Sequence, residues 1–336
     1  METPWLDRRY PVRQSPYYRS VVDEFHQWFL SFGLYDTDEK KQAFVAKDYP
    51  YLVSVAWPGC DRERLMVISA VAAALTERDD EGDANRSGAS LAKMRASLAD
   101  ARNHQTTMAE PRWGPLFTEI WRRLQAYSPP GQMARLADMI SAHIGGCIAY
   151  DEKLVAGEAP SSVKDYVDVR FFSIGQLVDH VLIEISLGID IGGVLDDPLM
   201  RELARCDVER VISYQDILSL RKDLAEGETE NLVHVFASEL HCSLPQAMTA
   251  ACAFFEEKMR RFDEVADEVK ASPLGRRPDV RLFVDGLNDF TSGLIEWTSC
   301  SARYTLRSTS EWVTPTVPFT RADQFGGRGR RPRTRG

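Results

Sequence analysis

The chain lacks the patterns that mark several common protein classes. Its six cysteines and six histidines form no HxxxH, HExxH or paired-cysteine arrangement, which argues against a zinc site. It contains no Gly-x-Ser-x-Gly turn and no phosphate-binding P-loop, so the usual serine hydrolases and P-loop nucleotide-binding proteins are excluded. The net charge of -9 leaves no basic surplus to neutralise phosphates, and we expect no nucleic-acid partner.

Long hydrophobic runs are missing as well. The longest nearly unbroken apolar run extends from Leu65 to Leu75, which is too short to span a bilayer. The first residues, Met1 to Trp5, show neither the basic nor the apolar region of a signal peptide. The scattered cysteines are typical of buried thiols in a reducing compartment. We therefore expect a cytoplasmic protein without a membrane span.

Helical periodicity dominates the chain, and the alternation typical of strands is scarce. No linker divides it, so we predict one all-α domain over residues 1–310, followed by a disordered tail over 311–336 that is rich in arginine and glycine. Ser161-Ser162 and Ser243 are expected to cap two of the helices. The predicted helices are 18–32, 62–78, 112–126, 132–156, 163–189, 197–224, 229–239, 244–270 and 278–306.

The most informative motif places an amide, a hydroxyl and a carboxylate four residues apart. Gln215, Ser219 and Asp223 occupy positions i, i+4 and i+8, on one stripe of a helix. This stripe continues the apolar side of the same helix, where polar groups are costly unless something satisfies them. A hard cation such as Mg2+ prefers oxygen ligands of this kind.

A second cluster of acidic residues follows the apolar helix that is predicted to end near Arg78. In Asp79-Asp80-Glu81-Gly82-Asp83, Asp79 and Asp83 are four residues apart, so one ion could face both. Carboxylates are unfavourable at the carboxyl end of a helix, where the backbone is already partly negative. A divalent cation would turn this repulsion into a ligand set. Taken alone, the cluster is also typical of a solvated acidic loop.

Together with four further segments, these motifs resemble class I terpene synthases, most closely the microbial single-domain, sesquiterpene-synthase-like type. The resemblance covers roughly residues 50–305 in the expected order, and the ordered combination is more specific than any single motif. The four further segments are Trp57–Leu65, the spaced residues Glu152, Pro160, Tyr166, Arg170 and Gly175, the stretch Gly227–Val233, and Gly293–Tyr304 with its final Arg303-Tyr304 pair.

The resemblance implies an antiparallel helical bundle of the isoprenoid synthase type, and an enzyme that is a carbon–oxygen lyase acting on diphosphates. Such an enzyme binds three Mg2+ ions, removes the diphosphate from a prenyl chain and cyclises the carbocation. The implied metal ligands are Asp79, Asp83, Gln215, Ser219 and Asp223. The implied diphosphate contacts are Arg170, Lys222, Arg303 and Tyr304, and the candidates for the cavity wall are Phe171, Phe172 and Trp297.

Farnesyl diphosphate is the expected substrate and a sesquiterpene the expected product, while geranyl and geranylgeranyl diphosphate stay open. A chain-elongating prenyltransferase would need a second aspartate-rich motif, which Gln215–Asp223 is not. The other alternative is a helical binding protein that keeps the fold with weak or no catalysis. Dimers are common in the resembling family, but the sequence leaves the oligomeric state open.

This chain departs from the family pattern at three places. Gln215 replaces the usual Asn or Asp and is one methylene longer, whereas Asp223 replaces the usual Glu and is one methylene shorter. We hypothesise that the two changes compensate by shifting the ion along the helix. Alanines at 72–74 replace the usual Trp and Phe before the aspartates, which leaves open a roomier cavity, an unusual substrate or poor cyclisation.

Overall fold

A computed structural model of the chain describes residues 10–83, 92, 93, 96, 112–226, 230–304, 306, 307, 312 and 313. The described part is helical except for one antiparallel pair of two-residue strands, β1 (Leu306–Arg307) and β2 (Trp312–Val313), and this confirms the all-α prediction. The helices are α1 (Tyr18–Leu30), α2 (Asp38–Lys47), α3 (Tyr49–Ala56), α4 (Arg62–Asp83), α6 (Gly114–Gln125), α7 (Pro130–Val155), α8 (Val163–Ser173), α9 (Gln176–Leu187), α10 (Pro198–Glu226), α11 (Leu232–Glu239), α12 (Leu244–Ala271) and α13 (Pro278–Cys300), with short 3-10 turns η1 (Gly192–Val194), η2 (Pro273–Arg276) and η3 (Ala302–Tyr304).

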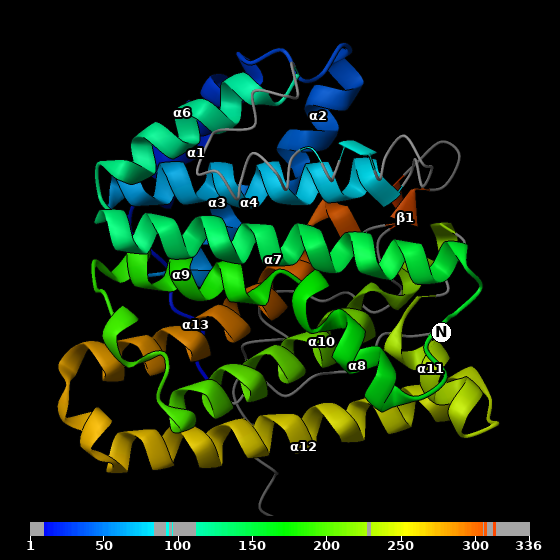
Figure 1. The fold of residues 1–336 in the computed structure, drawn as a ribbon. Coiled ribbons are helices and arrows are strands. Elements are labelled where there is room, and N and C mark those ends of the chain that lie inside the picture. Colours follow the sequence, from blue (N-terminus) through cyan, green and yellow to red (C-terminus); the bar gives the residue numbers. More distant parts are fainter. Residues whose placement is uncertain are drawn as a thin grey trace, which may run out of the picture.

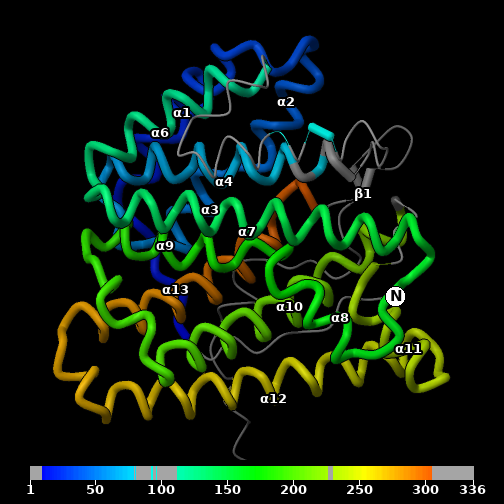
Figure 2. Tube along the Cα trace, viewed as in Figure 1, coloured from blue at the N-terminus to red at the C-terminus, as the bar shows by residue number. Residues whose placement is uncertain are grey.

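The helices form a bundle around α9, which contacts α4, α7, α10 and α13 and lies near the centre of the molecule (Figures 1 and 2). α12 packs along α10 on one side of the bundle, and α1 and α6 cover α4 on the other (Figure 1). η3 follows α13 and contacts α2 and α10. The chain end after α13 therefore lies against two helices that are far from it in sequence.

Most helix boundaries agree with the sequence prediction because polar caps mark them. Ser162 accepts a hydrogen bond from the backbone N–H of Asp165 at 3.1 Å, as expected of a residue that begins α8. At the start of α12, the Gln246 side chain accepts a bond from the backbone N–H of Ser243 at 3.0 Å, which is half of a capping box. Both predicted caps are confirmed.

Two helices, α2 and α3, lie where no helix was predicted. α2 has a single buried residue, Phe44, and so shows no apolar stripe. α3 is buried on all sides and therefore shows no periodicity either. They are separated by Asp48, whose φ of 53° breaks the helix in the left-handed region that aspartate tolerates better than most residues.

The predicted continuous helix 163–189 is wrong, because Gly175 divides it into α8 and α9. Gly175 has a φ of +82°, a conformation that is accessible to glycine at little cost. The ring of His143 on α7 lies 3.5 Å from the position that a Cβ on Gly175 would occupy. The break therefore faces α7, in the middle of the bundle.

Gly293 permits a close approach of α13 to α3. A Cβ on this residue would lie 2.3 Å from the backbone carbonyl of Val55, which is well inside van der Waals contact. The Gly293-x-x-x-Trp297 motif thus begins where two backbones touch. This contact fixes the position of α13 along α3. It therefore also fixes the position of Trp297 and of the chain end that carries Arg303.

The remaining sequence predictions concern the chain ends and the cysteines. Apart from Trp312 and Val313 in β2, the predicted tail over 311–336 lies outside the described residues. All six cysteines are free thiols, and two of them, Cys60 and Cys206, are buried. Within the described residues, no helix is both long enough and apolar enough to cross a membrane.

Candidate active site

The predicted acidic cluster lies in the last turns of α4, which continues to Asp83 instead of ending near Arg78. The cluster is therefore helical, and its residues alternate around the end of α4. The side chains of Asp79 and Asp83, the two predicted metal ligands on this helix, lie outside the described part of the chain. Asp80 lies between them in sequence, and the contacts of its side chain show which residues this end of α4 faces.

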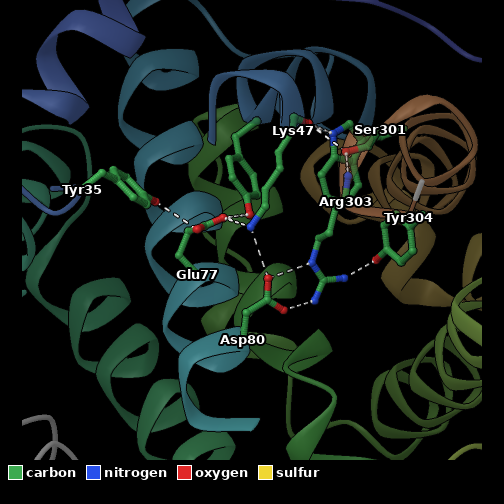
Figure 3. A network of polar contacts seen from close by, with 9 residues as sticks. Tyr35, Lys47, Glu77, Asp80, Ser301, Arg303 and Tyr304 are labelled. Atoms are coloured by element: carbon green, nitrogen blue, oxygen red, sulfur yellow. Dashed lines mark hydrogen bonds and ion pairs between the residues drawn. The ribbon is translucent and has the colours of Figure 1, made fainter. Parts of the chain in front are cut away.

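The carboxylate of Asp80 is held by a group of cations (Figure 3). Arg303 donates from Nη2 to Oδ1 at 2.6 Å and from Nε to Oδ2 at 3.4 Å, and Lys47 lies 3.3 Å from Oδ2. Burial alone would raise the pKa of Asp80. The charge and hydrogen bonds of Arg303, followed by the charges of Lys47 and Lys222, outweigh burial and hold the pKa below its usual value. Asp80 therefore stays ionised.

Lys47 also connects Asp80 to Glu77, one turn earlier on α4. Its ammonium group contacts both carboxylates, and Glu77 accepts further bonds from the hydroxyls of Tyr49 at 2.7 Å and Tyr35 at 3.0 Å. Figure 3 shows these side chains around the end of α4. Lys47 is not among the predicted site residues, because it belongs to no recognisable motif and its partners lie on another helix, about 30 residues further along the chain.

Trp297 fixes the chain end that carries Arg303. Its indole N–H donates to the backbone carbonyl of Lys47 at 2.7 Å, and Ser301 Oγ donates to the same oxygen at 2.9 Å. The Trp297 ring is buried and lies edge-on to that of Tyr304, with centroids 5.7 Å apart. Trp297, predicted as a cavity residue, thus packs between α2 and η3 and orients the Arg303-Tyr304 pair.

The Arg303-Tyr304 pair joins the two predicted metal motifs. Nη1 of Arg303 donates to the hydroxyl of Tyr304 at 2.7 Å, and Nε2 of Gln215 on α10 donates to the same hydroxyl at 3.1 Å. An unbroken series of polar contacts therefore leads from Asp80 on α4 to Gln215 on α10. The two motifs, distant in sequence, face each other at one end of the bundle, as the sequence analysis requires.

The α10 motif forms a second polar cluster beside this series. Oγ of Ser219 donates to Oδ2 of Asp223 at 2.6 Å, so the predicted stripe exists. Asn231, just before α11, donates from its amide to the same carboxylate oxygen at 2.8 Å. The carbonyl of this amide accepts from the backbone N–H of Val233 at 2.9 Å, which fixes the direction of the NH2 group. Asn231 lies in the Gly227–Val233 stretch and has no predicted role, and the structure shows that it orients Asp223.

Arg170 and Tyr166, on one face of α8, both reach Asp216 of α10. The Tyr166 hydroxyl donates to Asp216 at 2.6 Å, and the Arg170 guanidinium lies 3.6 Å from the other carboxylate oxygen. The backbone N–H of Leu232 donates to Asp216 at 2.9 Å. Despite these partners, burial raises the pKa of Asp216. The sequence analysis overlooked Asp216, although it directly follows Gln215.

The other predicted site residues lie around this end of α8 and α10. Lys222 acts electrostatically on Asp80, so the α10 motif contributes positive charge to the acidic side. Phe171 is partly buried and Phe172 is 47% exposed. Their rings meet edge to face with centroids 5.1 Å apart. They form an aromatic pair near the end of α8, a few residues before the break at Gly175.

The α10 cluster fits a hard divalent cation by its chemistry. Gln215, Ser219 and Asp223 present amide, hydroxyl and carboxylate oxygens, the ligand types that Mg2+ prefers. Ser219 and Asp223 already lie within hydrogen-bond distance of each other, and Asn231 holds the carboxylate in place, as outer-shell partners of metal ligands do. Among the described residues, no group of three or more histidine, cysteine or acidic side chains could hold a metal.

Comparison with known proteins identifies the family. The model of terpene synthase family 2, C-terminal metal binding, matches residues 72–261, a segment that contains both the acidic cluster and the Gln215–Asp223 motif. The chain belongs to the terpene synthase family. It is a class I terpene synthase, and its metal-binding family model indicates that it uses a divalent metal. The Arg303-Tyr304 pair lies beyond the matched segment.

Individual relatives resemble this terpene synthase over most of its length. Microbial Terpene synthase-like protein 13 of Selaginella moellendorffii is 24% identical over 319 residues, covering 91% of this chain and 87% of the relative. Delta(6)-protoilludene synthase 18 of Postia placenta is 25% identical over 304 residues, covering 86% and 83%. In fold, the chain is similar to the crystal structure of linalool/nerolidol synthase from Streptomyces clavuligerus, with a TM-score of 0.76, 17% identity and coverage of 87% and 99%.

Proposed function

We propose that this terpene synthase ionises farnesyl diphosphate with the help of three Mg2+ ions, cyclises the carbocation to a sesquiterpene and releases diphosphate. A prenyl diphosphate is the substrate that terpene cyclisation requires. The names of relatives that match most of the chain, such as Sesquiterpene synthase 6 of Postia placenta, support the farnesyl chain length. Diphosphate binding and metal binding are assigned to particular residues below.

The observation that carries the proposal is the contact series from Asp80 through Arg303 and Tyr304 to Gln215. When the bond between the prenyl carbon and the diphosphate oxygen breaks, negative charge develops on the leaving group. Groups that are already in place around that charge lower the barrier most, because they need not reorganise. The contact series brings oxygen-bearing and cationic side chains together at one end of the bundle. We call this end the rim; it carries Asp80, Lys47, Arg303, Tyr304 and Gln215.

Arg303 is the leading candidate for diphosphate binding. An arginine carries five N–H donors in a planar fork, and its contacts with Asp80 and Tyr304 use three of them. The other two are available to a diphosphate oxygen. Burial disfavours the charged form of Arg303, but Tyr304, Asp80 and Tyr49 outweigh burial and raise its pKa well above the usual value. The donor therefore remains cationic.

The other predicted diphosphate contacts differ in how far their charges and hydrogen-bond donors are already engaged by other residues. Lys222 already acts on the acidic rim and would serve as a point charge. The Tyr304 hydroxyl accepts from both Arg303 and Gln215, so its own proton can be donated to a phosphate oxygen. Arg170 pairs with Asp216, and we expect it to exchange part of this ion pair for a diphosphate contact.

Mg2+ would be held by Asp79 and Asp83 on the α4 side and by Gln215, Ser219 and Asp223 on the α10 side. When bound, it supplies positive charge to the leaving diphosphate. The chain's own residues orient the diphosphate, and Asn231 holds the Asp223 carboxylate in place. Phe171, Phe172 and Trp297 are proposed to line the path of the prenyl chain, where aromatic faces stabilise carbocations.

The direct test is incubation of the purified protein with Mg2+ and farnesyl diphosphate, followed by mass spectrometry of the volatile products. A cyclic hydrocarbon or alcohol, lost when EDTA is added, is expected. Geranyl and geranylgeranyl diphosphate, offered in parallel, would define the chain length. Longer diphosphates formed with added isopentenyl diphosphate would indicate a prenyltransferase instead, and unchanged substrate would indicate the binding protein.

The Asp79→Asn variant tests the metal assignment in the same assay. We expect a large loss of turnover with an unchanged circular dichroism spectrum, since the change removes a charge without altering the size of the side chain. An exposed aspartate on α7, Asp138, supplies the matched control as Asp138→Asn. Near-normal turnover in the Asp79 variant would remove that residue from the site.

A further inference from the structure

Lys47, the last residue of α2, contacts two other helices, one through its side chain and one through its backbone. Its ammonium group contacts two carboxylates of α4, those of Glu77 and Asp80. Its carbonyl oxygen accepts hydrogen bonds from Nε1 of Trp297 at 2.7 Å and from Oγ of Ser301 at 2.9 Å. Lys47 therefore joins the end of α4 to the end of α13.

The backbone carbonyl of Lys47 can accept these bonds because α2 ends here. The chain turns at Asp48, whose φ is 53°, and the backbone N–H of Tyr51 donates to the Asp48 side chain at 3.1 Å. The last carbonyls of a helix have no partner within the helix, and the end of α13 supplies the donors. A substitution of the Lys47 side chain leaves this backbone attachment in place.

Glu77 fixes the direction of the Lys47 side chain. The Glu77 side chain is buried, and its carboxylate accepts from Lys47 and from the hydroxyls of Tyr49 and Tyr35. Lysine side chains usually keep their ammonium group in water, but that of Lys47 is only 18% exposed. The position of this cation next to Asp80 is therefore set by the protein itself.

The contacts of Lys47 close a ring that contains Asp80, Arg303 and Ser301 (Figure 3). Nζ of Lys47 lies 3.3 Å from Oδ2 of Asp80, and Oδ1 of Asp80 accepts from Nη2 of Arg303 at 2.6 Å. The backbone N–H of Arg303 donates to Oγ of Ser301 at 3.3 Å, and this Oγ donates to the carbonyl of Lys47. The ring thus holds Arg303 at two points, its guanidinium group and its backbone.

We propose that Lys47 is a positioning residue for diphosphate release, which holds Asp80 in this ring and so keeps Arg303 where its remaining donors can reach the diphosphate. The inference rests on the proposed function, and it adds a residue of α2, a helix that carries neither metal motif. The balance of formal charge supports it. Glu77 and Asp80, about one turn apart on α4, repel each other, and without Lys47 the charge of Arg303 would have to offset both.

The test is the rate of diphosphate release at saturating farnesyl diphosphate and Mg2+ in Lys47→Met, a change that removes the charge and keeps much of the stem. We expect the rate to fall by about tenfold, because a small displacement of a group that acts on the transition state is costly. In an Arg303→Met background the same change should alter the rate by no more than about twofold, because Lys47 acts through Arg303.

The controls separate a loss of charge at this position from a general effect of the substitution. Lys40→Met removes an exposed lysine of the same helix, which is paired with Asp36, and it should release diphosphate at the wild-type rate. Lys47→Arg should restore most of the rate, because it keeps a positive charge between the two carboxylates. Circular dichroism shows whether each variant is folded.

Two results would overturn the role of Lys47 and leave the proposed function standing. One is a rate for folded Lys47→Met within about twofold of wild type. The other is a loss by the same factor with and without Arg303, as a general structural effect or direct binding of diphosphate by Lys47 would give.

If Lys47→Met does not fold, Ser301→Ala decides, because it opens the ring at one hydroxyl while Trp297 still holds the carbonyl of Lys47. We expect the rate to fall by about threefold in the presence of Arg303 and to be unchanged in Arg303→Met. An unchanged rate in Ser301→Ala alone would overturn the proposal. If the wild type released no diphosphate from farnesyl diphosphate, the proposed function would fail and this inference with it.

Discussion

Asp80 and Asp179 are both largely buried aspartates, yet their surroundings are opposite. Asp80, at the rim of the bundle, lies among Arg303, Lys47 and Lys222, and its pKa is lowered. Asp179, on α9, has a raised pKa, caused first by burial and then by the like charge of Asp207. One carboxyl group is kept ionised and the other is kept neutral.

The difference shows how one fold separates two kinds of chemistry. At the rim, where we propose that diphosphate is held and released, charges are present in both signs and compensate one another. In the interior, Asp207 is paired with Arg210 and contacts His180, whereas the raised pKa of Asp179 favours its neutral form.

Among the residues of the rim, Arg303 is expected to contribute most to the rate of diphosphate release. Replacing it by methionine removes the charge and all its donors while keeping much of the stem, and we expect the rate of diphosphate release to fall by about 100-fold or more. Arg303→Lys should recover only part of the rate, because lysine lacks the planar fork. The control is Arg201→Met, which removes an exposed pair with Asp196. A rate within twofold of wild type for Arg303→Met would contradict the rim assignment.

Asn231 should act on the metal through Asp223. The variant Asn231→Ser keeps an N-cap oxygen for α11 but loses the amide that donates to Asp223. We expect the apparent affinity for Mg2+ to weaken by about 10- to 100-fold, measured as the Mg2+ concentration that gives half-maximal activity. At saturating Mg2+ most of the activity should return. An unchanged Mg2+ requirement would show that Asn231 serves only as a helix cap.

The stability of the metal-free protein should depend on pH with opposite signs at the two aspartates. Asp80 has a lowered folded-state pKa, so its stabilisation is present above the unfolded pKa of about 3.9 and is lost as pH falls through the folded value. Asp179 has a raised folded-state pKa, so stability is lost as pH rises from the unfolded value through the folded one.

Thermal unfolding in EDTA checks this prediction. At pH 8, Asp80→Asn should lower the unfolding free energy by about 1–3 kcal/mol, because it leaves Arg303 without its main partner. Asp179→Asn should raise the unfolding free energy by on the order of 1 kcal/mol. The Asp179 difference should shrink at pH 4, whereas the Asp80 difference should shrink only as pH falls below about 3.9. Changes of the same sign for the two variants would break the comparison between rim and interior.

Gln215 and Asp223, two departures from the family pattern, are expected to compensate for each other. Replacing both should therefore change turnover only slightly. Gln215→Asn and Asp223→Glu should each reduce Mg2+-dependent turnover, while the double variant should return to within about threefold of wild type. The coupling between the two sites should be about 1 kcal/mol. Improved turnover in Asp223→Glu alone, without any need for Gln215→Asn, would show that the two substitutions are independent.

Much of the architecture could be predicted from the sequence because the long helices carry continuous apolar stripes and clear end signals. The predicted ranges for α10, α12 and the start of α13 differ from the observed ones by no more than a few residues. The errors have physical causes. α3 is buried on all sides, so it has no stripe to detect. Gly175 lies within an apolar pattern that continues past it, and its positive φ depends on contacts made by other helices.

The candidate site was predictable where a helix alone fixes the spacing. Ser219 and Asp223 meet because they are four residues apart on α10. Lys47 and Asp216 were missed for different reasons. Lys47 contacts Asp80 on α4, and its backbone carbonyl accepts from Trp297 on α13. These contacts join segments distant in sequence, so no local pattern could indicate them. Asp216 lies beside Gln215 in sequence, but its role as the partner of Tyr166 and Arg170 depends on how α8 packs on α10.

The measurement that tests the central claim most directly is a crystal structure with Mn2+ and diphosphate, in which anomalous scattering locates each metal. The account predicts metal on both sides of one diphosphate, within bonding distance of the carboxyl end of α4 and of Ser219 and Asp223, with Arg303 on the diphosphate. Metal bound at only one of the two helices, or a diphosphate remote from Arg303, would contradict it.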